Sequence, residues 1–332
     1  MQQRLEYIDA LRGLAIMLVV MMHIPQYGFG LPMGGFYMKC ATMLAVPLFF
    51  FISGLLSHGE LAPPNLSTYR KRVGVILVPT IVIGGFYTLL NHMDMETVML
   101  DKFKAGYWFT ITLFEYYVIH DFVKMMACKR QVVYDVMLIV VAFACYVVAM
   151  PTVQKVYANY AIPQMLGLPQ WKYFIFYVLG IFMRRYSHVL QSERGGFGIL
   201  LLFILAYGSN AIGEFRWSGL LYNANLLLQE VAIVLAAYYV FSKSQNIFSS
   251  TTRLGKCMVA LGTHTLEIYL LHYFALPRHL DLLFDVNALS SNPLMSMGVV
   301  GLASVCVIGV VWGVIHLLRS NSMLRAFLWG GR

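Results

Sequence analysis

The chain has 332 residues, of which 59% are hydrophobic and only 12% are charged. Soluble domains are about 45–50% apolar and about 25% charged, so the composition excludes an ordinary water-soluble globule, a disordered chain, a disulfide scaffold and a coiled coil. The net charge of +9 would suggest nucleic acid in a soluble protein. In so apolar a chain it indicates basic residues on one side of a lipid bilayer, with no nucleic-acid partner.

Apolar runs between charged or Gly/Pro-rich breaks predict a membrane helix wherever about 20 mainly apolar residues follow one another. The chain contains about ten such runs. In order, they cover residues 11–27, 41–58, 73–91, 106–126, 132–151, 171–186, 196–213, 219–242, 258–276 and 294–318. These runs take up most of the sequence. We therefore predict an all-α fold, a polytopic membrane helix bundle in which residues 1–332 form one domain and no soluble domain remains.

The distribution of basic residues indicates how these helices are oriented. With the N-terminus in the cytoplasm, the cytoplasmic loops and ends hold 17 of the 24 lysines and arginines, as the positive-inside rule requires. Every cytoplasmic segment after the first holds three of them, and an odd number of helices would break this pattern. Both termini are therefore predicted to be cytoplasmic.

The five cysteines are scattered along the chain, with no CxxC pair and no histidine spacing typical of zinc. An odd number without a pairing pattern gives no disulfide framework. We interpret these cysteines as small apolar packing residues, and we expect no metal site.

Ionisable side chains inside the predicted helices indicate function, because each costs about 2.5–3.5 kcal/mol on insertion scales. The residues concerned are His23, Glu115, His120, Asp121, Glu230, Glu267, His272 and His316. Each also has a structural alternative, a hydrogen bond to a neighbouring helix. Asp121 and His316 lie near cytoplasmic helix ends and are expected at the membrane interface.

The first helix has the clearest geometry. Arg12 and His23 are eleven residues apart, or about three turns, so both face the same way. This spacing separates them by about 16 Å, half the hydrocarbon thickness, with the cation at the cytoplasmic edge and the imidazole near the midplane. Asp9, one turn before Arg12, is placed to pair with the guanidinium or to orient it.

Three carboxylates are predicted to reach a similar depth in the membrane. Glu115 and Glu230 lie on helices that enter from the outer side, and Glu267 lies on a helix that enters from the inside. Several ionisable groups at one depth suggest a polar chamber at the centre of the bundle.

The first cytoplasmic loop carries Tyr69-Arg70-Lys71-Arg72 immediately before an apolar helix. One interpretation is a topology anchor, since basic residues hold a loop in the cytoplasm. The other is a phosphate clamp, because a group of cations at a helix N-terminus suits polyphosphate. The sequence leaves both interpretations open.

Four blocks of sequence resemble motifs of one known family and follow one another in the same order as in that family. They are Ile8–Ala15 followed by Val19–His23, then Pro47–Leu56, Tyr107–Glu115 and Leu261–His272. The first resembles the opening signature of the acyltransferase-3 membrane O-acyltransferases, an Arg, ten residues and a His. The other three resemble the family's FFxxSG second helix, its WFL block and its late LEIYLLH helix.

One position departs from the family pattern. The family often carries Arg-x-x-Arg before the proline of the third helix, whereas Val75 stands three positions after Arg72. Arg70 and Lys71 compensate in charge, so a basic contact is expected here although the spacing of the pair is lost.

The resemblance implies transfer of an acyl group, usually acetyl, from cytoplasmic acyl-CoA to a hydroxyl of a carbohydrate or lipid-linked glycan at the outer face. It implies a bacterial cytoplasmic (inner) membrane, acetyl-CoA or another acyl-CoA as donor substrate, and no permanently bound cofactor. His23 would act as general base, since histidine is the usual base near neutral pH. An acyl-His23 intermediate is the alternative.

The remaining roles that the resemblance implies fall into three groups. Glu115 would orient or charge His23. The CoA phosphates would bind to Arg12, Arg70, Lys71 and Arg72. Residues that support the site or line the chamber would be Asp9, Trp108, Glu230, Glu267, Tyr269 and His272.

Two other classes of function remain open from the sequence. A transporter or permease for a polar or anionic solute would use the same midplane carboxylates and histidines as its binding site. A receptor or scaffold without catalysis is the third class, for which eight ionisable residues in the spans are costly. Labelled acetyl-CoA separates the first two, because only the enzyme releases CoA.

Overall fold

The computed structural model describes residues 5–30, 36–57, 61, 65–190, 192–211 and 219–329, and every regular element in these ranges is helical. Arg4, Arg216 and Arg332, which the topology argument counted, lie outside the described residues. The chain divides into two compact units, each made of two segments: Met1–Leu56 with Gly180–Val310, and Ser57–Leu179 with Val311–Arg332. Each unit is described below by itself.

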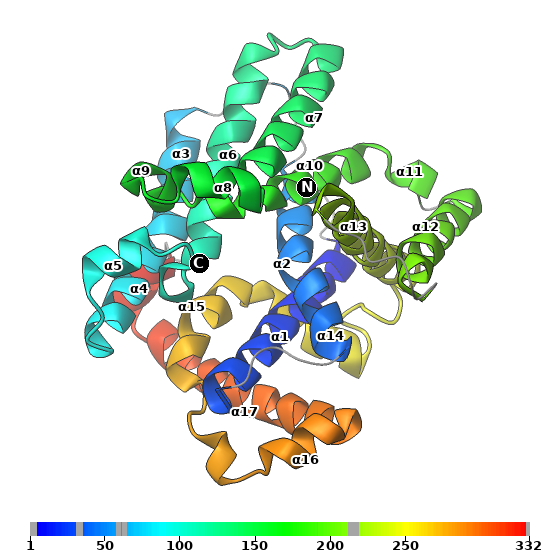
Figure 1. The fold of residues 1–332 in the computed structure, drawn as a ribbon. Helices are drawn as coiled ribbons and strands as arrows, with labels where there is room; N and C mark the ends of the chain where they lie inside the picture. The colour runs from blue at the N-terminus through cyan, green and yellow to red at the C-terminus, as the bar shows by residue number, and fades with distance from the viewer. Residues whose placement is uncertain are drawn as a thin grey trace. The chain divides into compact units, whose positions relative to one another are not determined.

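The first unit contains the helices that carry the N-terminal and late sequence motifs (Figure 1). Its elements are α1 (Glu6–Gly28), α2 (Phe36–Leu56), α11 (Ser187–Leu190), α12 (Glu193–Ala211), α13 (Gly219–Lys243), α14 (Arg253–Thr263), α15 (Thr265–Ala275), η4 (Leu280–Leu282) and α16 (Val286–Ser291). Two further helices, α10 (Phe174–Arg185) and α17 (Pro293–Ser320), cross the division between the units.

The second unit contains the basic loop and the aromatic block. Its elements are α3 (Leu66–Arg72), the π-helical η1 (Val73–Leu77), α4 (Val78–Leu90), α5 (Met95–Leu100), η2 (Lys104–Gly106), α6 (Trp108–Met126), α7 (Gln131–Val148), α8 (Pro151–Tyr157), α9 (Ala161–Met165), η3 (Leu168–Tyr173) and α18 (Ser322–Trp329).

The predicted all-helical, multi-pass architecture agrees with the structure. Within the described residues, all ten predicted spans fall on helices apart from short breaks and ends, and residues 58, 212 and 213 of these spans lie outside the described ranges. Among the described residues, six helices are long and apolar enough to cross a membrane: Glu6–Gly28, Met38–Leu56, Leu66–Leu90, Gln131–Val148, Leu221–Lys243 and Pro293–Ser320. The number of ten spans and the cytoplasmic side of the termini stay predictions.

The prediction of a single helix over residues 258–276 is wrong, because the structure has two helices there. His264 adopts φ −107° and ψ 18°, so α14 ends at Thr263 and α15 begins at Thr265. Glycine, threonine and histidine are weaker helix formers than the leucines that follow, and four of them stand together at 262–265.

Helix α1 packs closely against α14 at two glycines (Figure 1, α1 in blue). A Cβ on Gly262 would overlap the carbonyl oxygen of Asp9, and a Cβ on Gly13 would overlap that of Met258. Helices in membranes associate through such small residues because the backbones then approach each other closely. This crossing fixes α14, and with it the start of α15, against α1.

Candidate active site

The imidazole of His23 is held in one tautomer by helix α1. Its Nδ1 lies 2.7 Å from the carbonyl oxygen of Val19, and a carbonyl only accepts, so we assign the ring hydrogen to Nδ1. The neutral ring then carries its lone pair on Nε2. The hydroxyl of Tyr273 lies 2.9 Å from Nε2 and donates to it. The basic atom of His23 therefore already accepts a hydrogen bond from a hydroxyl.

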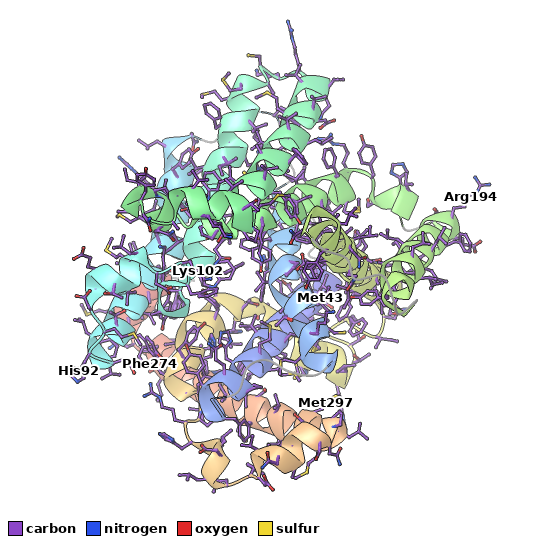
Figure 2. All side chains as sticks on the ribbon, in the orientation of Figure 1. Met43, His92, Lys102, Arg194, Phe274 and Met297 are labelled. Atoms are coloured by element: carbon purple, nitrogen blue, oxygen red, sulfur yellow. The ribbon has the colours of Figure 1, made fainter. Side chains whose placement is uncertain are left out.

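Aromatic rings from α1 and α15 surround this imidazole. The ring centroids of Tyr27, His272 and Tyr273 lie 6.0, 5.2 and 5.1 Å from that of His23. His272 is 0% exposed and Tyr273 is 4% exposed, whereas His23 is half-buried and keeps some accessible surface. The next residue of α15, Phe274, which is labelled in Figure 2, has 37% of its surface exposed. Tyr273 is therefore on the inward side of α15.

His272 has the same tautomer as His23. Its Nδ1 donates to the carbonyl oxygens of Tyr269 and Ile268, at 2.7 and 3.2 Å. Its Nε2 is buried and has no hydrogen-bond partner in the described part of the chain. Two imidazole lone pairs thus lie in this cluster beside the hydroxyl of Tyr273. The buried Tyr269 packs against His272, with ring centroids 6.1 Å apart.

The other predicted chamber residues of this unit lie on α13 and α15. Glu267 is buried, and its Oε2 lies 3.9 Å from Nε2 of His264. Glu230 on α13 is half-buried. The structure thus brings His272 and Tyr269 to His23, and its contacts join Glu267 to His264 instead.

At the start of α1, the predicted pairing of Asp9 with Arg12 is confirmed. Nη1 of Arg12 lies 3.5 Å from Oδ1 of Asp9, and the carboxylate is buried while a third of the arginine side chain is exposed. Glu6 accepts from the backbone N–H and the hydroxyl of Ser250, at 2.7 and 2.6 Å, which anchors the first turn. The guanidinium of Arg12 is thus oriented by Asp9 and remains accessible.

The three basic residues Arg70, Lys71 and Arg72 of the second unit differ in their contacts. Arg72 donates to the carboxylate of Asp121 and lies over the ring of Tyr117, 4.6 Å from its centroid. Arg70 and Lys71 are exposed. Asp121 is only 3% exposed, and its expected depth at the membrane interface stays a prediction. A buried carboxylate needs a partner, and Arg72 supplies one.

The backbone after Arg72 is also unusual. Residues Val73–Leu77 form a π-helix, and Pro79 follows within the first turn of α4. Proline has no N–H to donate to the carbonyl four residues earlier, so the helix changes its hydrogen-bonding pattern just before it. Such π-helical turns are frequent at functional sites. The π-helix was not predicted from the sequence, although Pro79 could have indicated an irregularity here.

Glu115 lies in the second unit, on α6. Its Oε2 accepts from Nε1 of Trp171 at 3.0 Å. Nearby, Trp108 stacks on Tyr173 with ring centroids 5.9 Å apart. Lys104 donates to the carbonyl oxygens of Met99 and Gln164, and burial lowers the pKa of its ammonium. His23 takes the contacts described above from its own unit, so orientation of His23 by Glu115 stays a prediction.

Sequence reasoning missed Tyr273. It follows His272 directly and stands four residues after Tyr269, so one face of the helix could have been extended to include it. Its role depends on the crossing of α15 with α1, which no local pattern encodes. Within the described residues, no group of three or more His, Cys, Asp or Glu side chains is arranged to hold a metal ion.

The fold and this cluster define a class of protein, an all-helical, multi-pass membrane protein with a histidine-centred polar site inside an apolar bundle. The family model described as an acyltransferase domain matches residues 5–317. The chain therefore belongs to the acyltransferase-3 family and is an acyltransferase. No curated protein and no solved structure matches it.

Proposed function

We propose that the protein is a membrane O-acyltransferase, with acetyl as the transferred group. It would move the group from cytoplasmic acetyl-CoA to a hydroxyl of a carbohydrate or lipid-linked glycan at the outer face of the bacterial cytoplasmic membrane. Ten spans and two cytoplasmic termini belong to the same proposal. One observation carries it: Nε2 of His23 already accepts a hydrogen bond from a hydroxyl, that of Tyr273 at 2.9 Å.

The chemistry follows from the tautomer of His23. A hydroxyl attacks a thioester poorly until a base removes its proton. The acceptor hydroxyl gives its proton to Nε2 as the new C–O bond forms. When the C–S bond breaks, the sulfur takes the electron pair and the proton from Nε2, which restores the neutral ring. Val19 holds Nδ1–H throughout, so the imidazolium keeps a hydrogen bond from each nitrogen.

The donor site is proposed from the charges at helix ends. Arg12 is accessible and oriented by Asp9, and guanidinium groups bind phosphate through charge-assisted hydrogen bonds. In the second unit, Arg70 and Lys71 are exposed and suit the same phosphates. Arg72 is already paired with Asp121, so we assign it a smaller share of phosphate binding than the sequence did.

The remaining predicted residues keep supporting roles in this proposal. Glu115 would orient or charge His23 once the substrates are bound. Trp108, Glu230, Glu267, Tyr269 and His272 would line the path of the acyl group. For Tyr269 and His272, contact with the His23 cluster supports this role.

Inverted membrane vesicles that carry the protein test this function. They are incubated with acetyl-CoA labelled in the acetyl group, which reaches the cytoplasmic face directly. The expected result is release of CoA thiol with label in base-labile esters on membrane glycans. Accumulation of a solute without CoA release would instead identify a transporter, and free labelled acetate alone would identify a hydrolase.

A further inference from the structure

The hydroxyl of Tyr273 cannot stay on Nε2 of His23 during the reaction. The Nε2 lone pair accepts from Tyr273 in the structure, yet a base must receive the proton of the acceptor hydroxyl at that same lone pair. The acceptor hydroxyl therefore displaces that of Tyr273. The released O–H then lies within a few ångströms of the reacting atoms and needs a new acceptor.

The reaction creates such an acceptor. When the acceptor oxygen bonds to the thioester carbon, the carbonyl oxygen takes the π electron pair and becomes an oxyanion. Donors held ready for that oxygen are the largest single source of rate in many acyl transfers. They act strongly where water is excluded, and Tyr273 is almost fully buried.

Among the described residues, the N–H donors of His23 and His272 are engaged, and the guanidinium of Arg12 is distant. The Nδ1–H groups of His23 and His272 are bonded to backbone carbonyls. Backbone N–H groups in the middle of α1 and α15 serve the helices themselves. Arg12 lies about 16 Å from His23 along α1. Among the described residues whose rings pack on His23, Tyr27 is the other hydroxyl donor.

The surroundings of Tyr273 keep its hydroxyl near the reacting atoms. Its ring packs against Tyr27, with centroids 5.9 Å apart, and against His272 at 4.1 Å. Ring packing of this kind restricts the side chain to a small motion. A rotation of the C–O–H bond and a small shift are enough to redirect the hydrogen bond.

We propose that Tyr273 is a catalytic residue whose hydroxyl leaves Nε2 of His23 when the acceptor binds and then donates to the oxyanion on the acyl carbonyl oxygen. The bond is a hydrogen bond only, so the phenol keeps its proton. That oxygen loses its charge when the C–S bond breaks, and Tyr273 returns to Nε2. This inference rests on the proposed function.

The test is Tyr273→Phe in inverted vesicles with labelled acetyl-CoA, with the rate expressed per folded molecule. We expect kcat to fall about 10²–10³-fold, as for the loss of one oxyanion donor, and KM for acetyl-CoA to stay unchanged. The control is Tyr238→Phe, which removes another buried tyrosine hydroxyl of this unit, outside the cluster, and should keep the wild-type rate.

Three results would overturn the inference. One is a wild-type kcat in Tyr273→Phe. Another is a large loss in Tyr27→Phe and none in Tyr273→Phe, which would assign the oxyanion to Tyr27. The third is a shifted pH profile with the full rate regained at higher pH, which would mean that Tyr273 only positions His23.

The outcome can be told apart from failure of the proposed function. If wild type transfers acetyl, His23→Gln does not, and Tyr273→Phe does, the function stands and this inference fails. Should Tyr273→Phe not accumulate, 3-fluorotyrosine at position 273 replaces it, because its more acidic phenol is a stronger donor. We expect a changed kcat at unchanged KM, and an unchanged kcat would overturn the inference.

Discussion

Two histidines, one on α1 in the first unit and one on α6 in the second, differ in how their ring nitrogens are bonded. His23 has one nitrogen fixed by the backbone, its other nitrogen on a hydroxyl, and part of its surface accessible. His120 has its nitrogens 3.0 and 2.6 Å from the hydroxyls of Tyr177 and Tyr134, and it is only 2% exposed.

This difference indicates which of the two imidazoles can accept a proton from a substrate. Both ring nitrogens of His120 are hydrogen-bonded and the residue is almost fully buried, as expected for a group that stabilises helix packing. His23 is fixed by its Nδ1 contact and keeps some accessible surface, which a base that meets a substrate hydroxyl requires. In sequence, both are simply histidines in an apolar run.

The largest expected effect is that of His23→Gln. Glutamine can still bond to Tyr273 but cannot act as a base, so the rate of acetyl transfer should fall about 10²–10⁴-fold while thermal stability in detergent stays near wild type. His316→Gln is the matched control, since Nδ1 of His316 makes the same contact to the carbonyl four residues earlier but lies on an exposed face. An equal loss of acetyl transfer in His23→Gln and His316→Gln would contradict a specific role for His23.

His120 should give the reverse pattern. In His120→Phe, the hydroxyls of Tyr134 and Tyr177 each lose a hydrogen bond inside a buried site, and each lost bond costs about 0.5–1.5 kcal/mol. We expect a lower unfolding temperature in detergent and, per folded molecule, an acetyl-transfer rate near wild type. A normal unfolding temperature with lost transfer would make His120 a catalytic candidate instead.

The glycine crossing tests how α15 is held at His23. In Gly262→Val, the new side chain would overlap the backbone of Asp9, so α14 must move and overpacking should cost about 1–3 kcal/mol. Stability and acetyl transfer should fall together. Gly301→Ala on α17, where a Cβ meets no atom within 4 Å, is the control. A fully active Gly262→Val would show that the crossing does not position the site.

The smallest effect is expected for the exposed Arg70 of the basic loop. Arg70→Met removes an exposed cation, and exposed ion pairs contribute about 0–1 kcal/mol, so KM for acetyl-CoA should rise up to about fivefold at unchanged stability. Arg72→Met instead leaves Asp121 buried without its cation and should lower stability. If Arg70→Met lowered stability and Arg72→Met only raised KM for acetyl-CoA, the structural role would belong to Arg70.

Much of this fold was predictable because long apolar runs have one favourable state in a bilayer. Helices such as α1, α2 and α17 follow directly from composition. The break at His264 was missed because the apolar runs before and after residues 262–265 were joined into one predicted span. Asp9 and Arg12 were paired correctly because both belong to one helix turn.

The contacts between distant segments were not predictable. Tyr273 and His23 are 250 residues apart, and Arg72 and Asp121 are 49 apart. Local spacing determines which face of a helix a residue occupies, but not which helix packs there. Gly13 and Gly262 lie where α1 and α14 approach each other closely, but a single sequence does not distinguish them from other glycines.

Chemical rescue of His23→Ala measures most directly whether a basic nitrogen at this position takes the proton. Truncation leaves space beside Tyr273, and free imidazole added to the vesicles should restore part of the acetyl transfer, whereas pyrrole, of the same shape but without a basic nitrogen, should not. Full transfer by His23→Ala without any addition, or equal restoration by pyrrole, would contradict the account.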